Sequence, residues 1–222
     1  MKPAARLWAW RIAVWVLALV PLALLGQRFY EARLTANPIE FIERYLGLWS
    51  LRLLMITLAV TPLRLLTGWS GPLKMRRTLG LWTFAYVCLH FSVYIVFDLN
   101  IFHPGIAARQ LAEDLVKRLY ITVGFTAWLL LTPLAITSTD AWQRRLKRNW
   151  KKLHQLIYVI AALGVLHFIW LVKKDESEPL IYAAILLVLL AWRWPGPQLK
   201  RAILRARTSQ ALASDQTLKS RS

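Results

Sequence analysis

Six long apolar segments constrain the fold of this 222-residue chain more than any other feature. They cover residues 7–25, 46–66, 79–97, 119–136, 153–172 and 180–194. Most are close to the ~20 residues with which a helix crosses ~30 Å of hydrocarbon, although the sixth is shorter. Backbone groups in lipid must be hydrogen-bonded within their own segment, so the sequence predicts an all-α, six-transmembrane-helix bundle. The hydrophobic content of 57% and the mean hydropathy of +0.43 agree with an integral membrane protein.

The positions of the charges predict the orientation of the bundle. The N-terminus, the loops at 67–78 and 137–152 and the C-terminal tail, with their flanks, hold 20 of the 29 Lys and Arg residues but only Asp140 and Asp215 among the 11 acids. The other connections, counted with Arg52 of the second span, balance nine basic against nine acidic residues. Short basic loops stay on the cytoplasmic side, so both termini are expected there. The net charge of +18 then faces anionic membrane lipid, and nucleic acid is not an expected partner.

The apolar segments predict one transmembrane domain over residues 1–195, followed by a basic cytoplasmic tail over 196–222. The first segment begins like a secretory signal, but its end, LALLGQRF, offers no small-x-small cleavage site, so a retained helix is expected. The single cysteine, Cys88, excludes an intrachain disulfide. No internal repeat is evident beyond the alternation of spans.

Three of the four histidines lie within predicted spans: His90 in the third, and His154 and His167 in the fifth. His103 is expected in a solvated outer loop. Ionisable groups at membrane depth normally face the bundle interior and have a partner. One such histidine could equally be a satisfied core residue, but three without a carboxylate in either span favour metal or haem ligation. Zinc and iron–sulfur motifs are absent from the sequence, whereas haem iron needs only one or two imidazoles in an apolar slot.

The spacing of these residues suggests two levels within the membrane. His154 and His167 are 13 residues apart, and Arg76 and His90 are 14 apart, which is ~20 Å along a helix in both cases. On an ideal helix 13 steps leave two side chains ~140° apart. The fifth span must therefore tighten locally or pass between two sites. Gly164 leaves room either for a flat ring or for close helix packing.

Four segments together resemble the ferric-reductase-like transmembrane family, which is shared with NADPH oxidases. Within that family they are most similar to haem-binding membrane subunits of bacterial periplasmic methionine-sulfoxide reductases. The segments are TPLR (61–64), RRTLGLWTFAYVCLH (76–90), ITSTDAWQRRLKRNWKKLHQLIY (136–158) and PLIYAAILLVLLA (179–191). The resemblance covers about residues 7–195.

The resemblance implies a multi-pass cytochrome of the bacterial inner membrane that binds haem b, as one or two groups, and FMN. It would take electrons from the quinone pool or a flavin reductase. It would pass them to a periplasmic molybdopterin-containing subunit, with which it forms a heterodimer, and that partner would reduce methionine sulfoxide in envelope proteins. The chain itself shows no nucleophile–base set, so it is expected to be a non-catalytic electron-transfer subunit.

Under this interpretation His90 and His167 ligate an outer haem, and His154 binds an inner haem. Arg76 occupies a position at which oxidase relatives carry a second histidine. A protonated guanidinium has no lone pair to donate to iron. Arg76 is therefore expected to pair with a haem propionate or to be a solvated charge. Arg77 is a second candidate of this kind. Three further cations could hold propionates or a flavin phosphate, or could face lipid: Arg144, Arg145 and Lys151.

Lys147 departs from the family pattern, because it stands where glycine is expected in an RxLGxxW run. Two rival functions remain: a small transporter that uses histidines as a proton relay, and a membrane anchor without haem. Both rivals predict a colourless protein.

Overall fold

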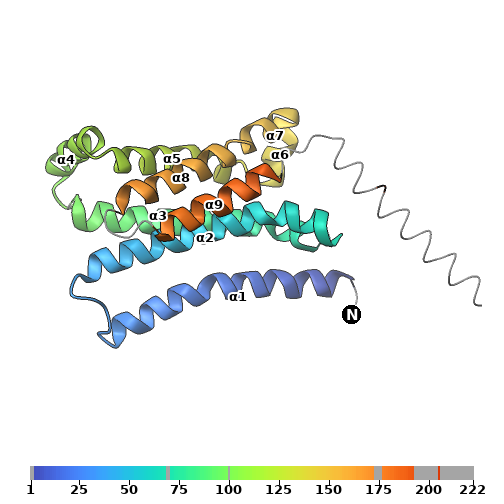
Figure 1. Cartoon of the computed structure of the whole chain (residues 1–222), viewed down its shortest axis with the longest axis horizontal. Helices are drawn as coiled ribbons and strands as arrows, with labels where there is room; N and C mark the ends of the chain where they lie inside the picture. Colours follow the sequence, from blue (N-terminus) through green and yellow to red (C-terminus); the bar gives the residue numbers. More distant parts are fainter. Residues whose placement is uncertain (1–2, 69–70, 100, 173–176, 193–204, 206–222) are drawn as a thin grey trace, which may run out of the picture.

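The structure, a computed structural model, describes residues 3–68, 71–99, 101–172, 177–192 and 205. All of the secondary structure within these residues is helical (Figure 1), which confirms the all-α prediction for this part of the chain. The helices are α1 (Pro3–Tyr30), α2 (Pro38–Thr67), α3 (Gly71–Val93), the π-helical turn η1 (Tyr94–Asp98), α4 (Pro104–Lys117), α5 (Leu119–Ile136), α6 (Asp140–Leu146), α7 (Arg148–His154), α8 (Ile157–Leu171) and α9 (Ser177–Ala191). The predicted tail lies outside the described residues, except for Arg205.

Five helical segments are long and apolar enough to cross a membrane. They are Trp8–Tyr30, Pro38–Thr67, Gly71–Asp98, Leu119–Ile136 and Arg148–Leu171. The sixth predicted span corresponds to α9, which is apolar but has only 15 residues. The start of α1, the α6–α7 pair and the end of α9 lie at one end of the bundle, and α4 lies at the other (Figure 1). The number of crossings and the cytoplasmic location of the termini stay predictions.

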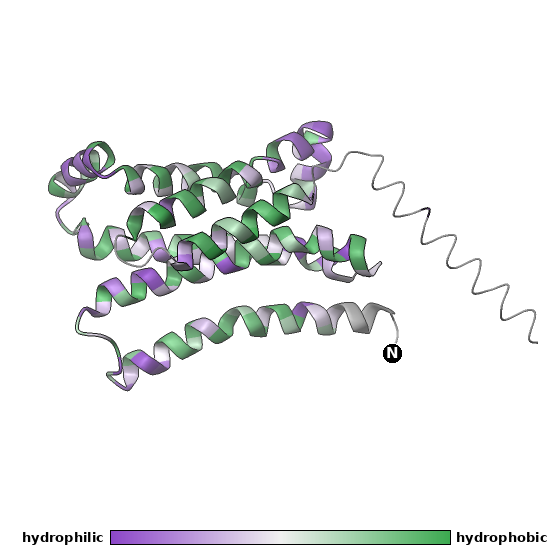
Figure 2. Ribbon diagram, viewed as in Figure 1, coloured by the Kyte–Doolittle hydropathy of each residue, from purple (hydrophilic) through white to green (hydrophobic). Residues whose placement is uncertain are grey.

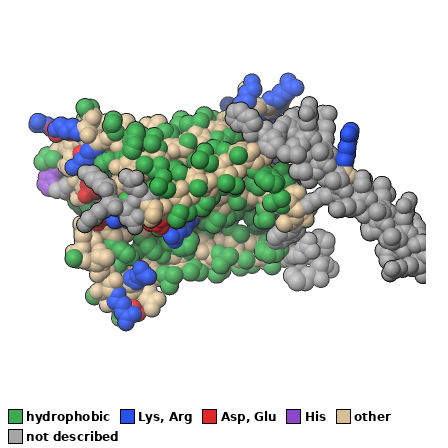
Figure 3. Space-filling model, in the orientation of Figure 1, with side chains coloured by type: hydrophobic (Ala, Val, Ile, Leu, Met, Phe, Trp, Pro, Cys, Tyr) green, Lys and Arg blue, Asp and Glu red, His purple; other side chains and the backbone are tan. Residues whose placement is uncertain are grey.

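The sides of the bundle are apolar, and polar residues gather at its ends (Figure 2). Figure 3 shows hydrophobic side chains over the middle of the face in view, with most Lys and Arg side chains toward the ends. Large apolar side chains of α1 are exposed, among them Trp15 at 55% and Leu17 at 69%. Such a surface would be unstable in water and suits contact with lipid tails.

Two helical hairpins form the centre of the bundle, because α2 packs most closely against α3 and α5 against α8. One core cluster joins α2, α8 and α9 around Leu58 and Ala161, which are 1% and 0% exposed. A second cluster joins α5 and α8 around Leu131 and Ile160. Helix α8 contributes to both clusters, so it connects the two hairpins.

Arg52 attaches α9 to the middle of α2. Its Nε donates a 2.9 Å hydrogen bond to the Tyr182 hydroxyl, and its Nη2 lies 3.8 Å from Glu178 Oε1. Its guanidinium also lies 4.9 Å from the centre of the Trp49 ring. A cation within an apolar helix requires partners of this kind, so the arginine has a structural explanation.

Helix α1 is attached through main-chain carbonyls near a proline. Pro21 lies inside α1, where a proline removes one helical hydrogen bond and displaces the preceding turn. The Tyr86 hydroxyl donates to the Ala18 carbonyl at 2.6 Å, and the Tyr45 hydroxyl donates to the Pro21 carbonyl at 3.0 Å. Two tyrosines, from α3 and α2, therefore bind α1 where its own hydrogen bonding is weakest.

Helix α4 covers the end of the bundle beside the start of α5. Its buried Asp114 accepts a 2.8 Å hydrogen bond from the Tyr94 hydroxyl of η1. On its outer face Lys117 and Arg109 both bond to Glu113, and these bonds and charges lower the pKa of that carboxyl group. One face of α4 is thus fixed to the bundle through Asp114. The opposite face is polar around Glu113.

The chain tightens between α7 and α8, in the middle of the fifth predicted span. Three bonds between residues 152 and 158 reach back three residues rather than four. They run from Gln155 N–H to the Lys152 carbonyl, from Leu156 N–H to Leu153 and from Tyr158 N–H to Gln155, at 3.2, 3.1 and 3.1 Å. Bonds of this length are 3₁₀-like and overwind the helix. The structure therefore agrees with local tightening, one of the two alternatives for this span.

Lys147 adopts a backbone conformation that favours glycine. Its φ is 47° and its ψ is −116°, and it joins α6 to α7. Lys147, the residue that departs from the family pattern, therefore has a backbone conformation that glycine adopts more easily. A side chain in this region of φ/ψ space is strained.

We expect Lys147→Gly to raise the free energy of unfolding by about 1 kcal/mol, because it relieves this strain. Thermal unfolding of the detergent-purified protein, followed by circular dichroism, measures the change. The matched control is Gln143→Gly in the helical backbone of α6, which should lower stability by about 1 kcal/mol. A Lys147→Gly variant that is as unstable as the control would contradict the assigned backbone strain.

Candidate functional site

A cavity of about 300 Å³ lies between α2, α3, α5 and α8, toward the α4 end of the bundle. Its volume is at the lower end of the ~300–1,000 Å³ range of small-molecule sites. Most of its lining is apolar, including Phe91, Leu131, Ile160 and Phe168. Two of the predicted site residues, His90 and His167, line it together.

The two histidines are oriented by main-chain carbonyls of neighbouring helices. His90 Nδ1 lies 2.9 Å from the Glu43 carbonyl of α2, and His167 Nδ1 lies 2.7 Å from the Tyr120 carbonyl of α5. A carbonyl oxygen only accepts, so each Nδ1 carries the proton and each Nε2 keeps its lone pair. This is the tautomer of a metal-ligating histidine whose second nitrogen is hydrogen-bonded.

The two imidazoles have the separation expected for ligands of one metal ion. Their ring centres are 6.2 Å apart and their planes make an angle of 75°. Two imidazoles that bind one metal ion from opposite sides, through bonds of about 2.0 Å, have ring centres about 6 Å apart. No cluster of three or more His, Cys, Asp or Glu side chains occurs among the described residues. Two axial imidazoles in an apolar cavity suit haem iron, so the residues present fit that group.

The cavity is built from two equivalent hairpins. Every lining residue within 43–54 and 83–94 has a lining counterpart 77 positions later, which is the spacing from His90 to His167. The tripeptide LHF occurs at 89–91 and again at 166–168. Because α2 and α5 run in the same direction (Figure 1), the hairpins form a parallel repeat. The expectation that the chain has no internal repeat was therefore wrong.

Each imidazole also lies against a glycine. A Cβ atom on Gly47 would be 3.2 Å from His90 Cε1, and one on Gly124 would be 2.7 Å from His167 Nδ1. Gly164 lines the same cavity, but a Cβ there would make an ordinary 3.7 Å contact with Leu51. Both alternatives for Gly164 stay predictions. Gly47 and Gly124, the glycines beside the rings, were not singled out from the sequence.

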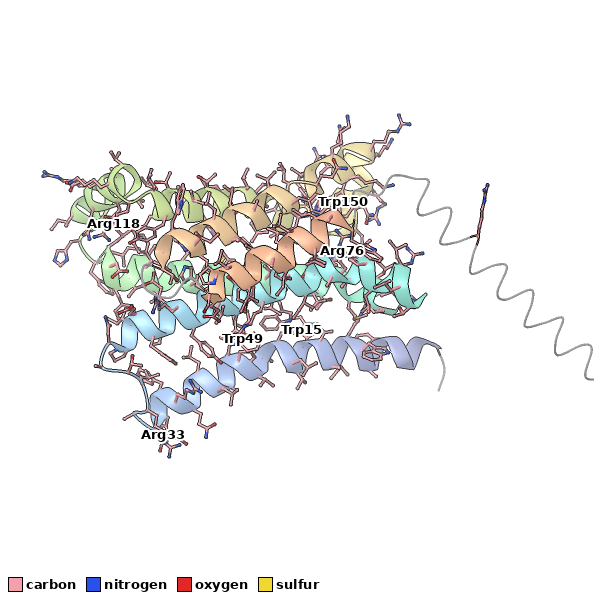
Figure 4. All side chains as sticks on the ribbon, viewed as in Figure 1. Trp15, Arg33, Trp49, Arg76, Arg118 and Trp150 are labelled. Atoms are coloured by element: carbon pink, nitrogen blue, oxygen red, sulfur yellow. The ribbon has the colours of Figure 1, made fainter. Side chains whose placement is uncertain are left out.

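Charged side chains gather at the mouth of the cavity, at the α4 end of the bundle. The lining includes two guanidinium groups, of Arg44 and Arg118, and the three carboxylates Glu40, Glu43 and Asp98. Arg118 is labelled in Figure 4 at the α4 end. Its Nε lies 3.3 Å from Asp114 Oδ1, and Arg44 Nη1 lies 3.8 Å from Glu40 Oε1. Neither arginine was singled out from the sequence.

His154 lies apart from this cavity. Its Nε2 is 3.1 Å from the Thr137 hydroxyl, and its ring stacks on Trp150 with centres 4.0 Å apart. Arg76 is half-buried and close enough to His154 for their charges to interact. Figure 4 shows Arg76 and Trp150 at the end of the bundle opposite Arg118. The two predicted levels are therefore separate in space.

The other predicted cations lie near His154 on exposed positions. Arg77 Nη1 makes a 2.7 Å ion pair with Asp140 Oδ1. Arg145 lies 5.1 Å from the centre of the Trp142 ring. Arg144 and Lys151 are exposed, and so is His103 at the opposite end, as expected for a solvated loop.

Comparison with known proteins identifies the family of the chain. The family model described as "Ferric reductase like transmembrane component" matches residues 46–165, which include His90 and His154. A protein-methionine-sulfoxide reductase heme-binding subunit MsrQ from Xanthomonas campestris pv. campestris (strain B100) is 51% identical over 211 residues, covering 92% of this chain and 94% of the relative.

The chain belongs to the MsrQ family. Two further relatives with the same description come from Xanthomonas axonopodis pv. citri (strain 306) and Rhodospirillum rubrum (strain ATCC 11170). They are 55% identical over 182 residues and 50% identical over 202 residues, covering 79% and 90% of this chain and 81% and 92% of their own lengths. Together with the apolar helices, membership of the MsrQ family makes this a multi-pass bacterial membrane protein.

Proposed function

We propose that the chain binds haem b and is the membrane electron-transfer subunit of a protein-methionine-sulfoxide reductase. The observation that carries the proposal is the pair of imidazoles, His90 and His167, 6.2 Å apart in one apolar cavity with Nδ1 of each tied to a carbonyl. The MsrQ relatives are described as haem-binding subunits of that reductase. When bound, haem supplies a one-electron Fe(III)/Fe(II) couple.

The chain's own residues orient the ligands, exclude water and set the charge around the site. The main-chain hydrogen bonds fix the two ring planes and raise the basicity of Nε2. The apolar lining keeps the local dielectric constant low, so the nearby charges strongly influence the redox potential. Arg44 and Arg118 are the cations that would pair with haem propionates at the outer mouth.

We further propose a direction for the electrons. The basic end with α6 and α7 would face the cytoplasm, so the His90–His167 cavity would lie toward the periplasm of an inner-membrane protein. The donor would be quinol or a flavin reductase. The acceptor would be a periplasmic molybdopterin-containing subunit that carries out the reduction of methionine sulfoxide. His154 would bind an inner haem with Arg76 beside it, and Arg77 and its neighbours would hold FMN or propionates.

His167→Ala should abolish the low-spin haem spectrum of the purified protein, because one of the two axial ligands is lost. Reduced-minus-oxidised absorption spectra measure this directly. The matched control is His103→Ala, since His103 is exposed and outside the cavity. An unchanged spectrum in His167→Ala would refute the outer site, and a colourless wild-type protein would favour a transporter or a haem-free anchor.

Arg118→Gln should reduce the haem retained per chain and lower the midpoint potential of the remaining haem. The variant removes a positive charge that would neutralise a propionate and favour the reduced iron. Potentiometric titration checks the second effect. Arg109→Gln, which is 84% exposed at the same end of the molecule, is the control. Equal potentials in both variants would exclude Arg118 from the propionate role.

The inner haem is tested by stoichiometry. In His154→Ala the pyridine haemochrome content per chain should fall by half, because one of two haems would be lost. The His90–His167 spectrum should persist in that variant. A haem content that His154→Ala leaves unchanged would restrict the chain to one haem.

A further inference from the structure

We propose that Gly47 and Gly124 are positioning residues that fix the planes of the two axial imidazoles. The inference rests on the proposed haem function and concerns how the ligands are held. Each glycine exposes the backbone of one helix to the ring carried by the next helix. The two rings thereby reach a defined angle to each other.

There is little space beside each ring. Real Cβ atoms essentially never approach another heavy atom closer than 3.0 Å, whereas one on Gly124 would be 2.7 Å from His167 Nδ1 and 2.9 Å from His167 Cε1. On Gly47 the contact with His90 Cε1 would be 3.2 Å, so the ring would have to give by a few tenths of an ångström. Both obstructions involve imidazole atoms.

The hydrogen-bond acceptors of the two rings lie close to the glycines in the chain. His90 bonds to the carbonyl of residue 43 and His167 to that of residue 120, and each acceptor is four residues before the glycine. In an α-helix that carbonyl is the one that also accepts from the glycine's own N–H. A side chain on the glycine would crowd the ring beside its bond to the shared carbonyl. Moving the ring away therefore weakens the Nδ1–H bond.

The same arrangement of glycine, carbonyl and histidine occurs in both hairpins. The distance along the chain from histidine to acceptor is 47 residues in both hairpins. Glycine, carbonyl and histidine recur as a unit, and the phenylalanine after each histidine lines the cavity in both copies. A chance gap beside one ring would not recur at the equivalent position of the other.

The consequence is a defined orientation of the ligands. The ring planes make an angle of 75°, close to perpendicular. Perpendicular imidazoles interact about equally with the two metal d orbitals of π symmetry, so a low-spin ferric site should give a strongly anisotropic electron paramagnetic resonance signal. A ring that turns toward the plane of its partner separates the two orbitals and makes the signal more rhombic.

The experiment uses the full-length protein purified in detergent, with Gly124→Ala, Gly47→Ala and the control Gly80→Ala. Gly80 lies in α3 outside the cavity lining, and a Cβ there would be 4.0 Å from Thr57 Cγ2. Gly124→Ala should lower haem affinity by about 10- to 100-fold, the range for loss of an interaction that orients a ligand. The haem that remains should give a more rhombic signal and a higher midpoint potential, because the weaker Nδ1–H bond makes Nε2 a poorer donor. Gly47→Ala should show the same changes to a smaller extent, and Gly80→Ala should show neither.

The outcomes separate this inference from the function on which it rests. A wild-type protein without haem would overturn the proposed function. A wild-type protein with haem, but with the same signal and potential in Gly124→Ala and Gly47→Ala, would overturn only the positioning role. Alanine favours helix over glycine, so a role limited to helix stability predicts variants at least as stable as wild type. If Gly124→Ala does not fold, Gly47→Ala decides the question, because its contact is milder.

Discussion

The structure depends on how a polar ring is satisfied inside an apolar bundle. Each cavity histidine donates a hydrogen bond from Nδ1–H to a main-chain carbonyl of another helix. His90 donates to the Glu43 carbonyl, and His167 donates to the Tyr120 carbonyl. These bonds join α3 to α2 and α8 to α5, and they determine which nitrogen keeps a lone pair. In lipid, an unsatisfied polar group costs several kcal/mol, so this orientation is strongly favoured over one without the bond. Each histidine therefore holds together the two helices of its own hairpin. The pair presents two ligand atoms to one cavity.

The rest of the bundle can be understood as support for two equivalent hairpins. Helix α8 packs against both core clusters, and Arg52 attaches α9 to α2. Helix α4 closes the outer end through the bond between Tyr94 and Asp114. The repeat breaks at the mouth, where Arg118 aligns with Phe41 and Arg44 with Ile121. Because its charges are not duplicated, the mouth would distinguish the charged edge of the proposed haem from its apolar edge.

Much of this was predictable from the sequence, because lipid allows few folds and histidines in spans are rare. The helical bundle, the pairing of His90 with His167 and the unusual position of Lys147 could be found from hydropathy, residue type and family pattern. The glycines beside the rings could not, since a glycine in a span is ordinary until the facing helix is known. The repeated LHF and the equal spacing from Gly47 to His90 and from Gly124 to His167 were the available signals. Arg118 was missed because it is 49 residues from His167 along the chain and adjoins it only through folding.

We propose that one haem iron lies between two imidazoles, which are supplied by equivalent hairpins. A cryo-electron microscopy map of the purified wild-type protein, at a resolution that defines side chains, tests this most directly. The account predicts density for a planar macrocycle between the rings of His90 and His167, with its acidic edge toward Arg44 and Arg118. Density for a macrocycle elsewhere in the bundle, with the two rings packed directly against each other, would contradict it.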